Sequence, residues 1–312
     1  MNWRRKDLLD LEVLSADEIR LVLDTAVSMK EVLARPVKKL PTLRGKAVST
    51  LFYEPSTRTR LSFETAAKIL GADTASLAVA QSSVSKGESL LDTAKTLAAM
   101  QVDLVVIRHA SAGAPHFLAE NLSLSVINAG DGQHAHPTQA LLDIFSMREK
   151  WGDVAGRKIL VVGDILHSRV ARSNAVGLSK LGAEVVLVGP PTLLPPEMDY
   201  LGVRLAYDFD RELKGADAVM MLRLQLERQR SGLFPSLREY NRLYGLTQER
   251  LARLGPDGVV LHPGPINRGV EIMSAAADDA RSLIETQVTN GVAVRMALIY
   301  LLIGGGTADV VA

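Results

Sequence analysis

Short runs of β-branched and aliphatic residues alternate with longer segments of helical periodicity along most of this 312-residue chain. Such alternation predicts parallel sheets that are covered by helices on both faces. The candidate strands are Ala47–Phe52, Leu104–Ile107, Ser125–Ile127, Lys158–Val162, Glu184–Val188, Val203–Ala206, Ala218–Leu222 and Val259–Leu261. The candidate helices between them include Leu90–Met100, Thr138–Glu149, Val170–Leu181 and Thr247–Leu254, and a capping box at Ser15 to Glu18 predicts a helix near the N-terminus.

The alternation breaks once, near Trp151-Gly152-Asp153, where a long helical segment ends and a new series of strands begins at Lys158. A chain of this length can hold two domains, each with its own core. We therefore predict an α/β protein of two domains, each a mostly parallel sheet flanked by helices. Residues 1–150 would form the first domain and residues 151–285 the second. The last helix, within residues 286–312, follows no strand and is expected to pack back on the first domain.

Composition narrows the class of protein. The formal net charge is +1 at pH 7, so no nucleic-acid or membrane partner is expected. The absence of cysteine excludes disulfides, thiolate catalysis and cysteine-ligated zinc. The basic residues near the N-terminus precede acidic ones and not an apolar segment, as a signal peptide would require, and apolar runs such as Met296 to Ile303 are too short to span a bilayer. We expect a cytoplasmic protein that uses no cofactor and no metal.

The segment Ser56-Thr57-Arg58-Thr59-Arg60 puts two arginines at the start of a predicted helix. The free N–H groups and the positive dipole end of a helix N-terminus disfavour cations and bind anions. Together with the hydroxyl and guanidinium groups, they predict a socket for a dianion such as a phosphate. The alternative is a serine N-cap followed by two solvated arginines.

Polar residues follow the other candidate strands as well. In open parallel sheets, ligands bind beyond the carboxyl ends of the strands, so these residues are candidates for a binding site. Their repeated arginines indicate a polyanionic ligand, although any single arginine is more often part of a surface ion pair. The segments are Arg108-His109, the loop from Asp131 to Gln139, Asp164 to Arg169, Arg223, and His262 to Pro265.

His136 immediately precedes Pro137, a residue that suits the first position of a helix. We therefore expect His136 and Gln139 near a helix N-terminus, where a histidine tends to stay neutral and can donate a hydrogen bond to a carbonyl oxygen. The alternative is a loop histidine that acts only as a cap.

The segment His262-Pro263-Gly264-Pro265 predicts a rigid turn after the last candidate strand. One of its X-Pro bonds is a candidate for the cis isomer. The carbonyl groups of the turn could accept hydrogen bonds from an amide –NH2, and the alternative is a purely structural turn.

Two further segments are less specific. The polar loop with Ser82 and Lys86 is either a solvated loop or a mobile phosphate clamp.

The run from Val161 to Asp164 starts a βαβ unit but lacks the second and third glycines of a dinucleotide fingerprint, and the next strand ends in Gly189-Pro190 without an acidic residue. We therefore do not expect nicotinamide binding.

Together these motifs resemble the aspartate/ornithine carbamoyltransferase family, in order and over nearly the whole chain. Ser56 to Arg60 resembles the carbamoyl-phosphate signature of the family, and His136 to Gln139 resembles its second signature. Arg223 to Gln225 and His262 to Pro265 indicate the aspartate branch, since the ornithine branch carries a cysteine in its late loop. The resemblance implies transfer of the carbamoyl group of carbamoyl phosphate to the amine of L-aspartate. The products would be N-carbamoyl-L-aspartate and phosphate, in an early step of de novo pyrimidine biosynthesis.

The resemblance implies a role for each matching residue. The catalytic groups would be Arg58, Thr59, Arg108 and His136. Carbamoyl phosphate would be bound by Ser56, Thr57, Arg58, Thr59, Arg108, His136, Gln139, Pro263, Gly264 and Pro265, with Ser82 and Lys86 from the adjacent chain. Aspartate would be bound by Lys86, Arg169, Arg223 and Gln225. Arg60, whose spacing puts it on one helix face with Glu64, is expected to be structural.

In this family the loop that carries Ser82 and Lys86 reaches into the site of a neighbouring subunit, so the resemblance implies a homotrimer with shared active sites. A regulatory chain or a dihydroorotase as a further partner stays open. Two other functions also stay open. One is a carbamoyltransferase that uses another amine acceptor, such as ornithine, and the other is a non-catalytic phosphate-binding assembly partner.

Overall fold

The computed structural model describes residues 3–78, 87–225 and 233–305 of the chain. Contacts within the chain divide it into two compact units. Unit 1 comprises Met1–Leu142 and Thr289–Ala312, and unit 2 comprises Asp143–Val288. The division falls inside helix α5 (Pro137–Trp151), which ends where the long helical segment was predicted to end. The boundaries and substrate labels that we gave the two domains stay predictions.

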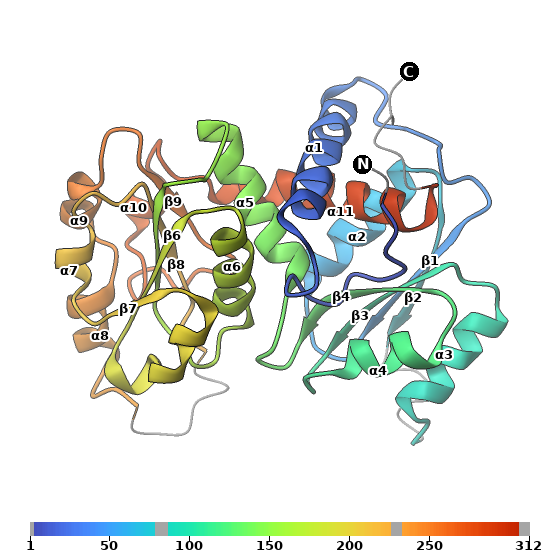
Figure 1. Ribbon diagram of the computed structural model, residues 1–312, viewed down its shortest axis with the longest axis horizontal. Coiled ribbons are helices and arrows are strands. Elements are labelled where there is room, and N and C mark those ends of the chain that lie inside the picture. The colour runs from blue at the N-terminus through green and yellow to red at the C-terminus, as the bar shows by residue number, and fades with distance from the viewer. Residues whose placement is uncertain (1–2, 79–86, 226–232, 306–312) are drawn as a thin grey trace. The chain divides into compact units, whose positions relative to one another are not determined.

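Unit 1 is built on a parallel sheet with the strand order β2-β1-β3-β4. The strands are β1 (Ala47–Phe52), β2 (Asp73–Ala78), β3 (Leu104–His109) and β4 (Ser125–Asp131). Helices lie on both faces of this sheet (Figure 1). On one face are α1 (Ala16–Ala34), α2 (Thr57–Ile69) and α11 (Ile284–Ile303), and on the other are α3 (Leu90–Ala99) and α4 (Ala114–Asn121).

The core of unit 1 follows from the alternation of side chains along its strands. Val105 and Ile107 are two residues apart and therefore point to the same face of the sheet, where they pack with Leu97 of α3 and Leu118 of α4. On the opposite face, Arg295 of α11 lies over the ring of Phe63 in α2, 5.1 Å from its centroid. Burial on both faces explains why the central strand β3 begins with a continuous apolar run.

Unit 2 contains a parallel five-stranded sheet with the order β7-β6-β5-β8-β9. Its strands are β5 (Lys158–Val162), β6 (Glu184–Val188), β7 (Arg204–Ala206), β8 (Ala218–Met221) and β9 (Val259–Leu261). Its helices are α6 (Arg169–Lys180), α7 (Phe209–Glu212), α8 (Leu237–Tyr244), α9 (Gln248–Arg253) and α10 (Ser274–Ala277), with 3-10 turns η3 (Pro191–Leu193) and η4 (Pro196–Leu201). Phe209, Tyr240 and Leu251 pack one face of this sheet together with Leu160 and Met221.

The structure confirms the predicted α/β class, and every candidate strand is present to within a few residues. It also contains β2, which we did not predict. The sequence of β2 is polar or small at most positions. Among the described strands it pairs with β1 alone, at the edge of the sheet, so it lacks the apolar run of a central strand. The capping box is confirmed, since the Ser15 hydroxyl accepts from Glu18 N and the Glu18 carboxylate accepts from Ser15 N.

Helix α11 as a whole has the length and the apolar composition to cross a membrane. The run from Met296 to Ile303, which we judged too short for this, is only a part of the helix. Its most apolar 18-residue window is 67% buried in the structure. Such burial is typical of the core helix of a globular domain.

Candidate active site

The strand order brings the predicted residues to the carboxyl edge of each sheet. In unit 1, β1 and β3 are neighbours, and the chain leaves them toward opposite sides of the sheet, which makes this a topological switch point. Phe52 at the end of β1 lies opposite Arg108 in the register, and Tyr53 N donates to the carbonyl of Arg108 at 2.9 Å. The loop before α2 and the end of β3 therefore occupy the same edge.

Helix α2 begins at Thr57, with Ser56 at its N-cap position. The Ser56 side chain makes no capping hydrogen bond, and the first turn contains no acidic residue. Thr59 is buried, whereas Thr57 and Arg58 are exposed. Since the serine does not serve as an ordinary side-chain cap, the alternative that we kept open for this segment loses its main support. What remains is a helix N-terminus with hydroxyl groups and a guanidinium group beside it, as anion binding requires.

Arg108 lies at the end of β3. Its Nε forms an ion pair with Glu54, 3.3 Å from Oε2, and its Nη1 donates to the carbonyl of Ala129 at 3.2 Å. Its side chain is only 15% exposed. These contacts hold the guanidinium at the carboxyl edge of the sheet, where ligands bind in open parallel sheets.

His136 connects β4 to α5. It is buried, and its carbonyl accepts from Gln139 N at 3.0 Å and from Ala140 N at 3.3 Å, so it stands just before the first turn of the helix. Gln139 is also buried. The structure therefore confirms the predicted position of both residues at a helix N-terminus.

Asp131, at the end of β4, organises the loop that leads to His136. Its carboxylate accepts from Asn128 Nδ2 and Gly113 N, both at 2.8 Å, and from Ala135 N at 3.1 Å. Burial alone would raise the pKa of Asp131, but hydrogen bonds from His134, Asn128 and Gly113 outweigh it and hold the pKa below the usual range. The sequence predicts Asp131 in a candidate loop but does not reveal this role. The turn Gly130-Asp131-Gly132 was the available signal.

In unit 2 the corresponding switch point lies between β5 and β8. Arg169 begins α6 after the Ser168 N-cap, is 4% exposed, and again has no acidic residue in its first turn. Gln225 follows β8, and its Nε2 donates to the carbonyl of His167 at 3.0 Å. Asp164, which is fully buried, accepts from Gln225 N at 3.3 Å and contacts His167 Nδ1 at 2.7 Å. The loop before Arg169 and the segment that carries Arg223 and Gln225 are thus joined.

The glycine in this loop has a packing role. A Cβ at Gly163 would lie 3.0 Å from the carbonyl oxygen of Leu222 and 3.1 Å from the hydroxyl of Tyr240, and its φ of +138° is rarely adopted by other residues. Close approach to Leu222 accounts for this glycine.

The third predicted segment of unit 2 follows β9, the neighbour of β8. The Gly264–Pro265 peptide bond is cis, as we expected for one bond of this turn. Gly264 N donates to His262 Nδ1 at 2.8 Å, and His262 Nε2 lies 3.2 Å from Glu271 Oε1. Sequence reasoning missed Glu271, because a single acidic residue in a loop has no pattern that predicts burial. Ser82 and Lys86 lie outside the described residues.

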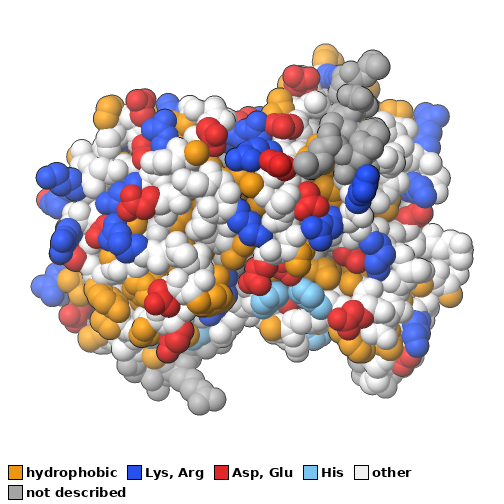
Figure 2. Space-filling view, viewed as in Figure 1, with side chains coloured by type: hydrophobic (Ala, Val, Ile, Leu, Met, Phe, Trp, Pro, Cys, Tyr) orange, Lys and Arg blue, Asp and Glu red, His pale blue; other side chains and the backbone are white. Residues whose placement is uncertain are grey.

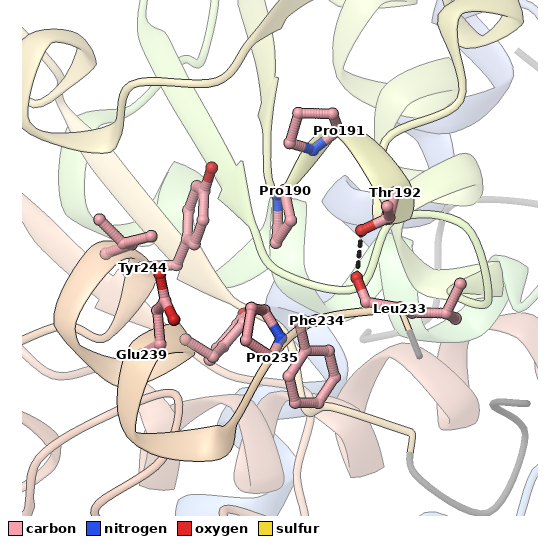
Figure 3. Close-up of a pocket in the computed structure, with 10 residues that line it drawn as sticks. Pro190, Pro191, Thr192, Leu233, Phe234, Pro235, Glu239 and Tyr244 are labelled. Atoms are coloured by element: carbon pink, nitrogen blue, oxygen red, sulfur yellow. Dashed lines mark hydrogen bonds between the residues drawn. The ribbon is translucent and has the colours of Figure 1, made fainter. Parts of the chain in front are cut away.

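A pocket of about 630 Å³ lies elsewhere in unit 2 (Figure 3). Prolines, aromatic rings and leucines make up most of its lining, and the Thr192 hydroxyl at its wall donates to the carbonyl of Leu233. Glu239 is the one charged residue among those described around it. An apolar pocket with a carboxylate does not suit the anionic ligand that the strand-end arginines indicate. The predicted site residues are not part of it.

Comparison with known proteins decides the family. The carbamoyl-P binding domain of aspartate/ornithine carbamoyltransferases matches residues 6–149, and the Asp/Orn binding domain of the same family matches residues 155–302. The chain belongs to the aspartate/ornithine carbamoyltransferase family.

Relatives within this family share most of their sequence with the chain. The aspartate carbamoyltransferase catalytic subunit of Desulfitobacterium hafniense (strain DSM 10664 / DCB-2) is 67% identical over 311 residues, which cover 100% of both chains. The catalytic subunit of Moorella thermoacetica is 63% identical and covers 98% of this chain and 99% of its own.

Solved structures of both branches of the carbamoyltransferase family have the same fold. Aspartate transcarbamoylase from Trypanosoma cruzi, in complex with carbamoyl aspartate and phosphate, has a TM-score of 0.87 at 28% identity and covers 96% of each chain. Ornithine carbamoyltransferase from Thermus thermophilus has a TM-score of 0.85 at 28% identity and covers 96% of this chain and 99% of its own. The fold is therefore common to both acceptor types, and the acceptor has to be argued from the more similar relatives and from the residues.

Proposed function

We propose that this chain transfers the carbamoyl group of carbamoyl phosphate to the amine of L-aspartate, giving N-carbamoyl-L-aspartate and phosphate in an early step of de novo pyrimidine biosynthesis. The observation that carries the proposal is the presence of arginines at the carboxyl edges of two parallel sheets in a chain 67% identical to an aspartate carbamoyltransferase catalytic subunit.

Carbamoyl phosphate is assigned to the residues of unit 1 and to the turn after β9. The phosphate would accept from the N–H groups at the start of α2, the hydroxyls of Ser56, Thr57 and Thr59, and the guanidinium of Arg58. Arg108 would bridge the phosphate and the carbonyl oxygen. The –NH2 group would donate to Gln139 and to the carbonyls of Pro263 and Gly264, with Pro265 completing the turn.

Aspartate is assigned to unit 2. Arg169 would bind its α-carboxylate, while Arg223 and Gln225 would bind its β-carboxylate. Arginine suits both tasks because it stays charged at any working pH and can bind a carboxylate through two N–H groups. A cationic acceptor side chain such as that of ornithine would be repelled by Arg223, which favours aspartate.

The chemistry follows from these contacts. The neutral amine of aspartate attacks the carbonyl carbon and a C–N bond forms. The bond between this carbon and the bridging oxygen of the phosphate breaks, and phosphate leaves with the bonding electrons and takes up the proton that the amine loses. Negative charge develops on the carbonyl oxygen, where Thr59, Arg108 and His136 would stabilise it, at about 2.7–4 kcal/mol for each well-placed donor. Positioning of two bound substrates adds up to about 7–11 kcal/mol.

A colorimetric assay for the ureido product tests the proposal. Carbamoyl phosphate is supplied with aspartate, with ornithine or with no acceptor. If product forms with aspartate and not with ornithine, the result supports the proposed function. If product forms with ornithine and not with aspartate, the protein is an ornithine carbamoyltransferase instead. Carbamoyl-phosphate binding without product would indicate a non-catalytic binding partner.

We also propose a cytoplasmic homotrimer in which Ser82 and Lys86 of one chain complete the site of the next, with Lys86 contributing to both substrates. The mass of the purified protein in solution tests the trimer. A larger assembly isolated from the native host would reveal a regulatory chain or a dihydroorotase bound to it.

A further inference from the structure

Two histidines and an aspartate of unit 1 form a cluster that the proposed reaction does not use. His116 of α4, Asp131 of β4 and His134 each offer one ligand atom, and these atoms lie within 4.8 Å of one another. The two histidine rings are 5.6 Å apart in an edge-to-face arrangement. Asp131 is fully buried, while the histidine side chains are 35% exposed, so the cluster is accessible from solvent. Histidine side chains lie beside acidic ones on the face shown in Figure 2.

The contacts of His116 determine which of its nitrogens can act as a ligand. Nε2 lies 3.0 Å from Oδ2 of Asp10, a nearly buried carboxylate whose other oxygen accepts two backbone N–H groups. Since an ionised carboxylate can only accept, Nε2 carries the proton and Nδ1 keeps its lone pair. Nδ1 is buried and has no hydrogen-bond partner among the residues that the structure describes. A histidine with a carboxylate on one nitrogen and a free lone pair on the other is the usual arrangement of a metal ligand.

Asp131 is also held in a position that suits a metal ligand. Its carboxylate is fixed by donors from Asn128, Gly113 and Ala135, and His134 Nδ1 lies 3.0 Å from Oδ2. This distance is close to the separation of two ligand atoms on a tetrahedral ion with bonds of about 2.0–2.1 Å. An ion would replace the hydrogen bond between His134 and Asp131 with two metal bonds.

We propose that His116, Asp131 and His134 bind one divalent transition-metal ion, with Asp10 orienting His116. Two imidazoles and one carboxylate suit Zn²⁺, Co²⁺ or Ni²⁺, whereas Mg²⁺ and Ca²⁺ prefer an all-oxygen set. Three protein ligands leave a fourth position for water. The ion takes no part in the carbamoyl transfer.

The position of the cluster gives the ion a regulatory role, and this part rests on the proposed function. Asp131 and His134 belong to the loop that ends at His136. An ion bound to both would restrict this loop and with it the imidazole assigned to the carbonyl oxygen. Occupancy should therefore change turnover without being required for it.

Isothermal titration of the metal-free full-length protein with ZnCl2 tests the binding site without any assay of activity. We expect about one Zn²⁺ per chain and no comparable heat with MgCl2. Loss of a ligand in His116→Gln should weaken binding at least tenfold, and loss of the orienting carboxylate in Asp10→Asn should weaken it about 10–100-fold. Asp17→Asn is the matched control for Asp10→Asn, because Asp17 lies in unit 1 outside the cluster with a side chain that is 65% exposed, and its loss should leave Zn²⁺ affinity unchanged.

Thermal melting without metal shows whether each variant folds. If His116→Gln does not fold, the half-exposed His134 carries the same test as His134→Gln. Absence of Zn²⁺ binding to the native chain, or equal affinity in the ligand variants and in Asp17→Asn, would overturn the site. Turnover that is independent of Zn²⁺ despite one bound ion would overturn only the regulatory role, and failure of the carbamoyltransferase assay would leave the titration result intact.

Discussion

His262 and Glu271 form a fully buried pair, with Nε2 of the histidine 3.2 Å from Oε1 of the glutamate. The other ring nitrogen, Nδ1, accepts from Gly264 N at 2.8 Å. Glu271 Oε1 also accepts from Asn267 N at 2.6 Å. The histidine ring therefore connects a buried carboxylate to the turn that we assign to the carbamoyl amide.

Replacement of this carboxylate by an amide should weaken both stability and substrate binding. In Glu271→Gln the amide oxygen can still accept from His262 and Asn267, but it carries no charge, and the –NH2 group takes the buried place of Oε2, which has no hydrogen-bond partner among the described residues. We therefore expect the free energy of unfolding to fall by about 1–3 kcal/mol. The KM for carbamoyl phosphate should rise because the turn is held less firmly. Urea unfolding and steady-state kinetics measure the two effects. Glu249→Gln, at a side chain that is 80% exposed, should change the stability by less than about 0.5 kcal/mol.

Arg58→Ala should slow turnover by on the order of a hundredfold or more, because a charged donor at the leaving phosphate is lost. The matched control is Arg60→Ala in the same helix turn, since Arg60 Nε lies 3.7 Å from Oε1 of Glu64 and is assigned a structural role. Near-normal turnover of Arg58→Ala would remove this residue from the catalytic groups.

Mixing two inactive variants tests whether sites are shared between chains. Arg58→Ala and Lys86→Ala chains, unfolded together and refolded, should form hybrid trimers that regain part of the activity, since some sites then combine two intact halves. Each variant refolded alone is the control. No recovery in a sample whose mixed composition is proven by mass spectrometry would argue against a shared site.

The ion pair between Arg204 and Glu212 predicts a pH-dependent contribution to stability. Arg204 donates to both carboxylate oxygens of Glu212, at 2.8 and 2.7 Å, and these bonds lower the pKa of Glu212 from 4.5 to about 2. Because the folded-state pKa is the lower one, the stabilisation is complete above pH 4.5 and is lost as the pH falls through that value toward 2.

Urea unfolding at a series of pH values from about 6 to about 3 measures this effect, because the stabilisation by Glu212 begins to be lost within that range. The stability difference between the native chain and Glu212→Gln should shrink as the pH falls. Glu184→Gln is the matched control, because Glu184 lies 3.3 Å from the same arginine but its side chain is 55% exposed. A difference that stays constant with pH would contradict the assigned ion pair.

Local patterns predicted most of the fold. Apolar runs located the strands that are buried on both faces, and the Ser15 capping box located the start of α1. The edge strand β2 was missed because only one neighbour stabilises it, so its residues need not be apolar. For the candidate site, residues next to strand ends and helix starts could be predicted, since backbone geometry alone places them.

The residues that hold the site were not predictable in the same way. Asp131, Asp164 and Glu271 are buried carboxylates, and their roles depend on donors that come from other segments. No local sequence pattern distinguishes an acidic residue that will be buried from one that will be exposed.

Sequence patterns were enough to predict the α/β class, the position of the helix N-termini that carry Arg58 and Arg169, and the family resemblance. These depend on interactions between residues close together in the chain. The tertiary structure alone decided the strand order that brings Arg108 opposite Phe52, the buried link from Glu271 through His262 to Gly264, and the cluster of His116 with His134. The physical reason is that strand order and buried polar contacts are settled by packing between distant segments, where a polar group is stable only with its partner.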